Sequence, residues 1–205
     1  ANVVILTDRG VDENHVAIPS LLAVSAVHHH LIETKKSTSV SIILESGEPR
    51  EVHHFATLLG YGACAINPYL AQFSIKKLIQ DGLLKKDYYA AVNDYNNAVL
   101  HGIVKIASKM GISTLQSYQG SQIFEAVGIS KKVIDEYFTN TVSRVEGITI
   151  EDIAEDVFAY YLVYKKYQDD YGIDDILNGN VSSQIYARLF NADFDERVSV
   201  VNLVM

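Results

Sequence analysis

Four short polar segments follow apolar runs and hold the residues best placed to do chemistry. They are Thr7-Asp8-Arg9-Gly10, Glu45-Ser46-Gly47-Glu48, Asn67-Pro68 and Gln116-Ser117-Tyr118-Gln119-Gly120. Ligand sites in parallel α/β sheets gather where the carboxyl ends of the strands meet. We therefore expect the four segments to converge on one polar edge, which is the predicted place of function.

The turn Ser46-Gly47-Glu48 has two interpretations. Its backbone N–H groups could hold an anion at the start of a helix. However, Glu45, Glu48 and Glu51 bring negative charge to the same place. The glutamates more simply stabilise the positive end of a helix dipole. Helix capping is therefore the favoured interpretation, and anion binding is the alternative.

The histidine runs do not predict a metal site. His28-His29-His30 and His53-His54 are consecutive residues on predicted helices. Side chains of neighbouring helical residues point about 100° apart, so each run cannot surround one ion. We expect the first run at a solvated helix end or partner surface. In the second run, we expect one histidine to pack and the other to face a loop.

Motifs for covalent catalysis and nucleotide binding are missing from the sequence. Cys64 is the single cysteine, and its apolar surroundings predict a small buried side chain. One thiol cannot hold an iron–sulfur cluster alone. Gly60-Tyr61-Gly62 lacks the third glycine of a dinucleotide fingerprint and follows a predicted helix. No spacing favours a Ser/His/Asp triad. We therefore expect no catalytic residue, cofactor or metal in this chain.

Composition limits the class of protein. The chain has 205 residues, of which 48% are hydrophobic, enough for one sizeable domain with a buried core. Its net charge of −8 argues against nucleic-acid binding, because an acidic surface repels phosphate. No apolar stretch approaches the roughly 20 residues of a membrane span. The single cysteine and the missing signal peptide favour the cytoplasm.

Alternating apolar runs and helical periodicity predict an α/β fold with parallel strands joined by helical crossovers. The expected strands cover 3–7, 40–44, 63–66 and 113–116, and the expected helices cover 16–33, 49–59, 68–79, 119–127 and 149–167. A helical insertion is expected at 87–110. Ser130 should cap a further short helix, and Thr149-Ile150-Glu151-Asp152 has the pattern of a capping box. After residue 171, only a possible helix at 183–190 and an apolar end at 198–204 are indicated.

Long segments of the chain resemble the central domain of the glutamate synthase large subunit. They are LTDRGVDENHVAIPSLLAVSAVHHHLI (Leu6 to Ile32), SVSIILESGEPREVHHFATLLGYGACAINPYLA (Ser39 to Ala71), KMGISTLQSYQGSQIFEAVGIS (Lys109 to Ser130) and TVSRVEGITIEDIAED (Thr141 to Asp156). The resemblance covers residues 1–168 and leaves 169–205 as a tail of uncertain assignment. It also implies a partial (β/α) barrel-like arrangement, because that domain resembles the family's flavin barrel.

In that family, a glutaminase domain releases ammonia, which travels through a tunnel to a flavin-bearing barrel and adds to 2-oxoglutarate. The resemblance implies that this chain is a fragment of such an enzyme. Its partners would be the glutaminase and flavin domains of the same parent chain. The parent would carry FMN and an iron–sulfur cluster, and this fragment neither. The family's glutaminase uses an N-terminal cysteine, whereas this chain starts with Ala1, so the isolated fragment is predicted to be inactive.

The resemblance and the predicted edge together suggest which residues line the ammonia path or a domain interface. The candidates are Ser46, Gly47, Glu48, Gln116, Ser117, Tyr118 and Gly120. Small residues and neutral hydrogen-bonding groups suit neutral ammonia better than a row of fixed charges. Two alternatives stay open at this point. The polar loops could simply cover the sheet edge, or the chain could be an autonomous α/β domain acting as a scaffold or small-ligand binder.

Overall fold

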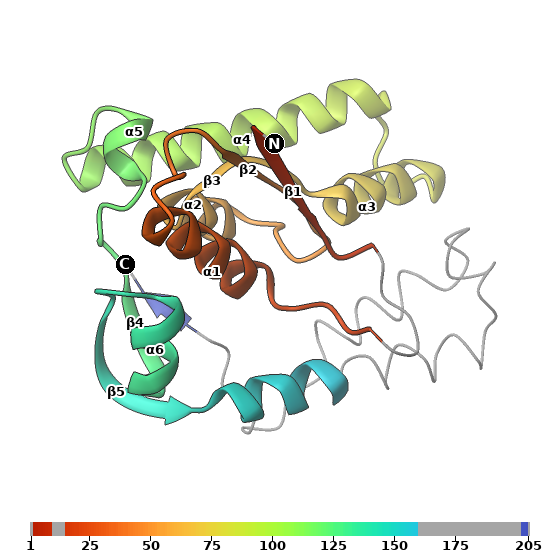
Figure 1. Ribbon diagram of the computed structural model, residues 1–205. Coiled ribbons are helices and arrows are strands. Elements are labelled where there is room, and N and C mark those ends of the chain that lie inside the picture. Colours follow the sequence, from red (N-terminus) through yellow and green to blue (C-terminus); the bar gives the residue numbers. More distant parts are fainter. Residues whose placement is uncertain (1, 10–14, 160–201, 205) are drawn as a thin grey trace.

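The structure is a computed structural model that describes residues 2–9, 15–159 and 202–204. Its first sheet has three parallel strands in chain order, β1 (Val3–Thr7), β2 (Ser41–Glu45) and β3 (Ala63–Asn67). Helix α1 (Ser20–Glu33) connects β1 to β2, and α2 (Val52–Gly60) connects β2 to β3 (Figure 1). The predicted alternation of strands and helices is confirmed over this part of the chain.

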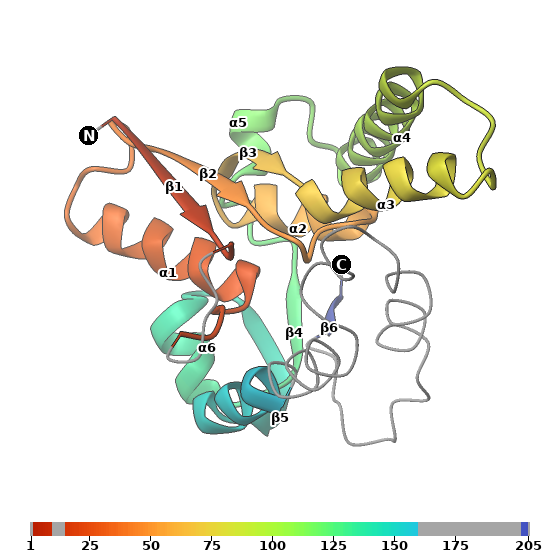
Figure 2. The ribbon, with the colours of Figure 1, turned by 90° about the vertical axis from the view of Figure 1, so that its right-hand side faces the viewer.

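Both connecting helices cover the same face of this sheet (Figure 2). Strand residues alternate between two faces. One face of β2 and β3 packs against the two helices, and its core consists of Val24, Leu44, Leu58 and Ala63. On the opposite face, Val3 is 46% exposed and Ile5 is 62% exposed. The sheet is therefore buried on one side and open on the other among the described elements.

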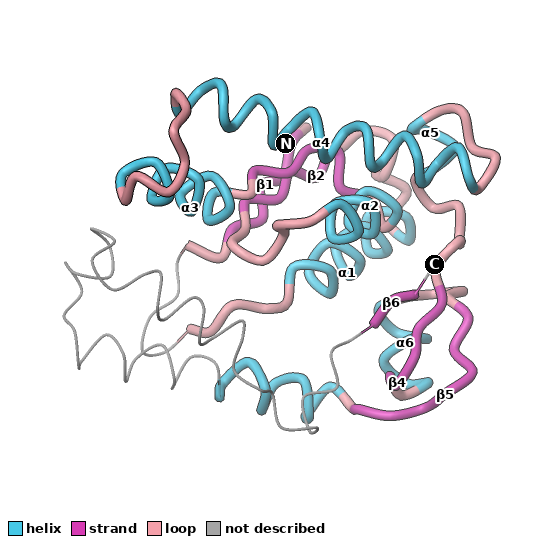
Figure 3. The backbone as a smooth tube through the Cα atoms, turned by 180° about the vertical axis from the view of Figure 1, so that it is seen from behind, coloured by secondary structure: helices cyan, strands magenta, loops and turns pink. Residues whose placement is uncertain are grey.

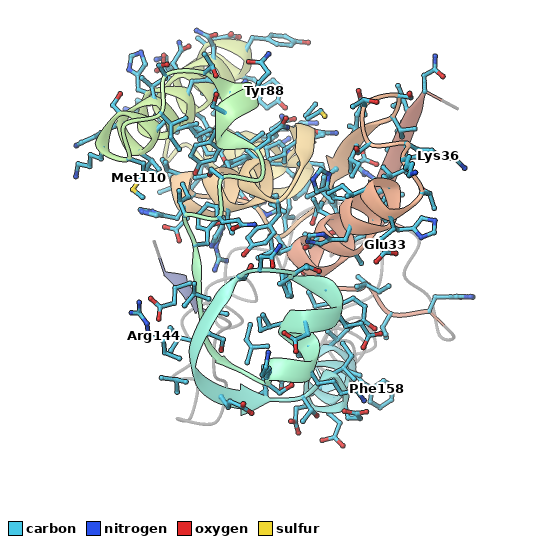
Figure 4. All side chains as sticks on the ribbon, turned by 60° about the vertical axis from the view of Figure 1, so that its left-hand side comes forward. Glu33, Lys36, Tyr88, Met110, Arg144 and Phe158 are labelled. Carbon is cyan, nitrogen blue, oxygen red and sulfur yellow. The ribbon has the colours of Figure 1, made fainter. Side chains whose placement is uncertain are left out.

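A helical hairpin lies beside the sheet, formed by α3 (Tyr69–Gln80) and α4 (Tyr88–Lys109). Asp87 starts α4 by accepting a hydrogen bond from the Ala90 N–H at 3.1 Å. The helix packs against α2, and Gly102 allows the close approach. A Cβ atom at that position would lie 2.5 Å from Val52. The predicted insertion is thus a single long helix, with Tyr88 and Met110 marking its two ends in Figure 4.

A second sheet has the order β5-β4-β6, formed by β4 (Glu125–Ile129), β5 (Val142–Ile148) and β6 (Asn202–Val204). Strand β4 runs parallel to β5 and antiparallel to β6. Helix α6 (Lys131–Tyr137) joins β4 to β5, and another helix begins at Ile150 and continues to residue 159 (Figure 3). The core here consists of Ala126, Ile129, Val133, Ile134, Phe138 and Ile153.

The fold class is α/β, with parallel strands and helical crossovers as predicted. The strands of the described residues form two separate three-stranded sheets, and neither closes on itself. Ser130 occupies the N-cap position of α6 as predicted, but its hydroxyl makes no capping hydrogen bond. The predicted capping box at 149–152 is formed. In that box, the Thr149 N–H donates to Asp152 Oδ2 at 2.7 Å and the Asp152 N–H donates to Thr149 Oγ1 at 3.3 Å.

The predicted strand at 113–116 and the predicted helix at 119–127 are wrong. Thr114 instead caps the short helix α5 (Leu115–Tyr118), accepting from the Ser117 N–H at 3.3 Å. Residues 125–129 form β4, and β5 was not predicted. Gly120 and Gly128 have positive φ angles of 70° and 76°, which are incompatible with a continuing helix. Residues 160–167 and 183–190, where helix was predicted, lie outside the described residues.

Two predicted helices also begin later than expected. The N-cap residue Pro19 has a ψ of 132°, so α1 starts at Ser20 rather than at residue 16. Glu51 is extended, with φ −127° and ψ 165°, so α2 starts at Val52 rather than at residue 49. In both cases the preceding backbone is extended so that the chain can turn from the strand end into the helix.

Candidate functional site

The carboxyl edge of the first sheet, where β1, β2 and β3 end, is organised around Asp8. Its Oδ2 atom accepts hydrogen bonds from Ser46 Oγ at 2.7 Å and from the Gly47 N–H at 2.8 Å. Its Oδ1 atom accepts a hydrogen bond from Tyr69 Oη at 2.8 Å. One carboxylate therefore joins the ends of β1 and β2 to the start of α3.

A second carboxylate, Glu48, joins this edge to α1. Glu48 Oε2 accepts a hydrogen bond from the Ser20 N–H at 2.9 Å, and the Glu48 N–H donates to Ser46 Oγ at 3.1 Å. The buried hydroxyls of Ser20 and Ser46 lie 2.7 Å apart. The prediction that Glu48 caps a helix is correct in kind, but the helix is α1 rather than the following α2. Burial raises the pKa of the Glu48 carboxyl, hydrogen bonds from Ser20 oppose this, and the charge of Asp8 adds to it.

Glu45 holds the three strand ends together on the outer side of the same edge. Its carboxylate accepts hydrogen bonds from Thr7 Oγ1 at 3.0 Å and Asn67 Nδ2 at 3.2 Å. It also pairs with Arg9 Nε at 2.9 Å, and the guanidinium of Arg9 lies 3.9 Å above the ring centre of Tyr69. The segments that follow β1, β2 and β3 therefore converge as predicted, and Arg9 is paired with Glu45 among them.

The fourth segment does not join this edge, so the expected convergence of all four is wrong. The Gly120 N–H donates to the Gly60 carbonyl at 2.8 Å, and Gln119 Nε2 donates to the Ala63 carbonyl at 3.0 Å. Ala63 is the first residue of β3, so this segment lies at the amino edge, where β1, β2 and β3 begin. The physical reason is that most of this segment is itself the short helix α5, and no parallel strand precedes it.

Tyr118 is the buried member of this second group. It is 1% exposed and packs with Ala56 and Phe124. Its hydroxyl has no hydrogen-bond partner among the described residues, and burial raises its pKa to about 12. Gln116, Ser117 and Gly120 are exposed. The candidate residues thus divide into a hydrogen-bonded group at the carboxyl edge, in which Ser46 is buried, Gly47 half-buried and Glu48 exposed, and a largely exposed group at the amino edge.

A cleft of about 470 Å³ extends from Glu48 between the two sheets. The starts of α1 and α2 and the core of the second sheet form its walls, which include Ser20, Leu22, Glu48, His54, Leu58, Ile129 and Phe138. Burial lowers the pKa of His54 and favours its neutral form, while Glu51, whose Oε1 lies 3.3 Å from His54 Nε2, opposes this shift. The cleft can therefore offer hydrogen bonds to a small molecule over an apolar floor. No sequence motif indicated it, because its walls come from distant segments.

The histidine runs behave largely as predicted. His30 is exposed, while His28 packs against Gly62, where a Cβ atom would lie 2.5 Å from the ring. Desolvation lowers the pKa of His28. In the second run, His53 is exposed and His54 Nδ1 accepts a hydrogen bond from the Arg50 N–H at 3.3 Å. The described residues contain no group of three or more His, Cys, Asp or Glu side chains placed to hold a metal ion.

Cys64 was predicted to be buried, and this prediction is wrong, because the thiol is exposed. The neighbouring Ala63 faces α2 and is fully buried, so Cys64 points to the opposite, open face of the sheet. A short apolar run shows that a strand is present but not which of its faces is covered. None of the described helices has the length and apolar character needed to cross a membrane.

Comparison with known proteins decides the family. Residues 1–130 match the glutamate synthase central domain. The chain belongs to this family. The matched residues of this central domain contain the whole first sheet, helices α1 to α5 and strand β4, and therefore both groups of candidate residues.

Relatives of this central domain are much longer proteins. It is 54% identical over 170 residues to the glutamate synthase (NADPH) large chain of Bacillus subtilis, covering 83% of this chain and 11% of that protein. Identity to the glutamate synthase (NADH) of Saccharomyces cerevisiae is 44% over 167 residues, which cover 78% of this chain and 8% of that protein. Identity to the ferredoxin-dependent glutamate synthase 2 of Synechocystis sp. is 43% over 175 residues, which cover 78% of this chain and 11% of that protein. The chain thus spans about a tenth of the length of these relatives.

Proposed function

We propose that this chain links the glutaminase and flavin domains of a glutamate synthase large chain and lines the path of ammonia between them. The match of residues 1–130 to the central domain family carries this proposal. Relatives named for NADPH, NADH and ferredoxin share the same segment, so its role does not depend on the electron donor. The parent enzyme is proposed to be a cytoplasmic oxidoreductase of glutamate biosynthesis, with this domain ending near residue 168.

The first proposed stretch of the path is the turn Ser46-Gly47-Glu48 at the carboxyl edge. Ser46 is fully buried, and a Cβ atom at Gly47 would lie 3.2 Å from Tyr69 Oη, so a larger side chain has little room. Burial raises the pKa of the Glu48 carboxyl, so this side chain is more easily protonated to its neutral form. These features support a narrow passage for a small neutral molecule.

The second proposed stretch consists of Gln116, Ser117, Tyr118 and Gly120 at the amino edge. The unpaired hydroxyl of Tyr118 supports this assignment, because a buried hydroxyl without a partner can bind a small molecule such as ammonia or water. The two stretches lie at opposite ends of the strands. A path that touches both must run the length of β3, so we propose that they act as separate parts of the route.

Changes that narrow the path should separate the two half-reactions of the parent enzyme. In the large chain that carries this sequence, Gly47→Val and Ser117→Leu should lower glutamine-dependent glutamate formation more than glutamine hydrolysis. A roughly tenfold difference between the two losses corresponds to about 1.4 kcal/mol. Ser108→Leu, which changes an exposed serine on α4, is the matched control and should change neither rate. Equal losses of both activities, or no losses, would contradict the path assignment.

We also propose that FMN and the iron–sulfur cluster belong to other parts of the parent chain. Arg9 is already paired with Glu45 and Tyr69, so it is committed within the carboxyl edge. The isolated chain should lose FMN absorbance on gel filtration after incubation with the cofactor. It should release no ammonia from glutamine. Release that disappears in Cys64→Ser would show a glutaminase activity that this proposal excludes.

The alternative function is an autonomous α/β domain acting as a scaffold or small-ligand binder, and the cleft beside Glu48 favours it. A mature cellular protein of about this length, detected by mass spectrometry, would support the alternative. A parent several times longer would support the central domain role. The partial (β/α) barrel-like arrangement is likewise a proposal for the parent chain, in which the free edges of the two sheets would pair with further strands.

A further inference from the structure

The face of the first sheet opposite α1 and α2 is largely apolar and open. Val3, Ile5, Ile43, Cys64 and Ala65 form its apolar part, and we call these five residues the open face. The exposed Ser41, the partner of Val3 in β2, borders them at the amino end. Ile5 is 62% exposed and Val3 is 46% exposed. In Figure 2, α1 and α2 lie below the sheet, and no described helix lies above β1 and β2.

An uncovered apolar face is unusual for a parallel sheet. Such sheets are normally covered on both faces, and their strands are correspondingly apolar throughout. The sequence of β1, Val-Val-Ile-Leu-Thr, has this character, because residues directed to either face are apolar. The open face therefore has the composition of a buried surface, although nothing in the described residues covers it.

The open face has a sharp polar boundary at the carboxyl edge. Thr7, Asn67 and Arg9 all contact the Glu45 carboxylate, so these polar groups are satisfied by one another. Groups that already have partners do not need any from a covering layer. The five residues of the open face carry no charge. Charged groups in a covering layer would therefore lose their hydration there without gaining a partner. The layer that fits is therefore apolar and ends before Thr7.

We propose that an apolar layer from another part of the same large chain packs on the open face. The length of the relatives supports this occupant, because this chain spans 8–11% of them and most of each polypeptide lies outside it. The size of the face also supports it. A stable interface between separate proteins uses roughly 20–30 residues on each side, far more than the open face offers. A layer tethered by the chain needs less area, because its effective concentration is high.

This inference goes beyond the ammonia path and does not depend on it. The path concerns small molecules at the two strand edges, and its test compares two activities of the parent enzyme. The covering layer concerns packing on the face between those edges, and its tests measure thiol protection and thermal unfolding. Each proposal can therefore fail while the other holds.

Cys64 provides a direct probe of the covering layer. In the native large chain that carries this sequence, iodoacetamide labelling can be followed on the tryptic peptide 51–76, which contains the only cysteine of this chain. The comparison is a thiol introduced by Leu83→Cys, at a position that is 73% exposed and away from the sheet. A covered Cys64 should react at least roughly tenfold more slowly than this control. Similar rates would overturn the proposal, as would protection that depends on protein concentration, because a second copy would then be the cover.

A charge on the open face gives an independent test. Ile5→Glu in the large chain should place an unpaired carboxylate under the covering layer and lower the unfolding temperature by roughly 4 °C or more. Ile18→Glu is the matched control, because Ile18 is 63% exposed and precedes α1. The control should shift the unfolding temperature much less. If Ile5→Glu is tolerated as well as the control, the open face faces solvent in the parent and the proposal is wrong.

Discussion

The two edges of the first sheet hold their polar groups in different ways. At the carboxyl edge, Asp8 has three hydrogen-bond donors and Glu48 receives the Ser20 N–H. At the amino edge, the buried Tyr118 hydroxyl has no partner among the described residues, and main-chain contacts such as that of Gly120 with Gly60 hold the segment. The carboxyl edge is therefore fixed by hydrogen bonds to carboxylates, whereas the amino edge is fixed by close packing.

Removing the carboxylate at the centre of the carboxyl edge should have the largest effect. Asp8→Ala leaves the Ser46 hydroxyl, the Gly47 N–H and the Tyr69 hydroxyl each without this acceptor. We expect the free energy of unfolding, measured with urea, to fall by about 3 kcal/mol or more. The control is Asp94→Ala, which removes a 62% exposed carboxylate paired with Lys86 and should cost less than about 1 kcal/mol. Equal losses of unfolding free energy in the two variants would show that the hydrogen bonds to Asp8 contribute no more than an exposed ion pair.

Adding one methyl group should test the packing of the amino edge. A Cβ atom at Gly60 would lie 2.2 Å from Phe124 Cε2, so Gly60→Ala should lower the free energy of unfolding by about 2 kcal/mol. Phe124→Leu in the same chain should recover part of that loss, because it removes the obstructing ring atoms. A double-mutant cycle measured by urea unfolding checks this coupling. Additive effects of the two substitutions would contradict the proposed contact.

Two tyrosines should respond differently to the loss of their hydroxyl group, one with lower stability and one without. Tyr61 Oη lies 2.7 Å from Thr141 Oγ1, so Tyr61→Phe should cost about 1 kcal/mol of unfolding free energy. Tyr118→Phe removes a hydroxyl without a partner and should be neutral or stabilising by up to about 1 kcal/mol. Thermal or urea unfolding distinguishes the two. A clear loss in Tyr118→Phe would mean that its hydroxyl has a bound partner, such as the small molecule proposed for the path.

The smallest expected effect concerns pH and Glu48. Burial holds the folded-state pKa of Glu48 above its ordinary value of 4.5, so folding favours the protonated carboxyl. That contribution to stability is fully present below about pH 4.5 and is lost as the pH rises through the folded pKa. Glu48→Gln cannot ionise, so its unfolding free energy should rise relative to that of the unchanged protein between pH 4.5 and pH 7. A difference that stays constant with pH would contradict the raised pKa.

The sequence predicted the first sheet well and the second sheet poorly, for a physical reason. Strands β1, β2 and β3 are apolar runs separated by helices, and each signal is contained within a few residues. Strand β4 contains a glutamate and a glycine with positive φ, and it is formed through pairing with β5 and with β6 near residue 203. A strand that depends on such pairing has only a weak local signal.

The sequence by itself determined the order of elements in the first 110 residues, the capping box at Thr149 and the family. These features depend on short-range backbone preferences and on long matching segments. Only the tertiary structure decided that Glu48 caps α1, 28 residues away, and that Tyr69 contacts Asp8 across 61 residues. It also decided that Cys64 is exposed and that Tyr118 lies at the amino edge. Each of these outcomes depends on which distant segments pack together, and local patterns carry no information about those contacts.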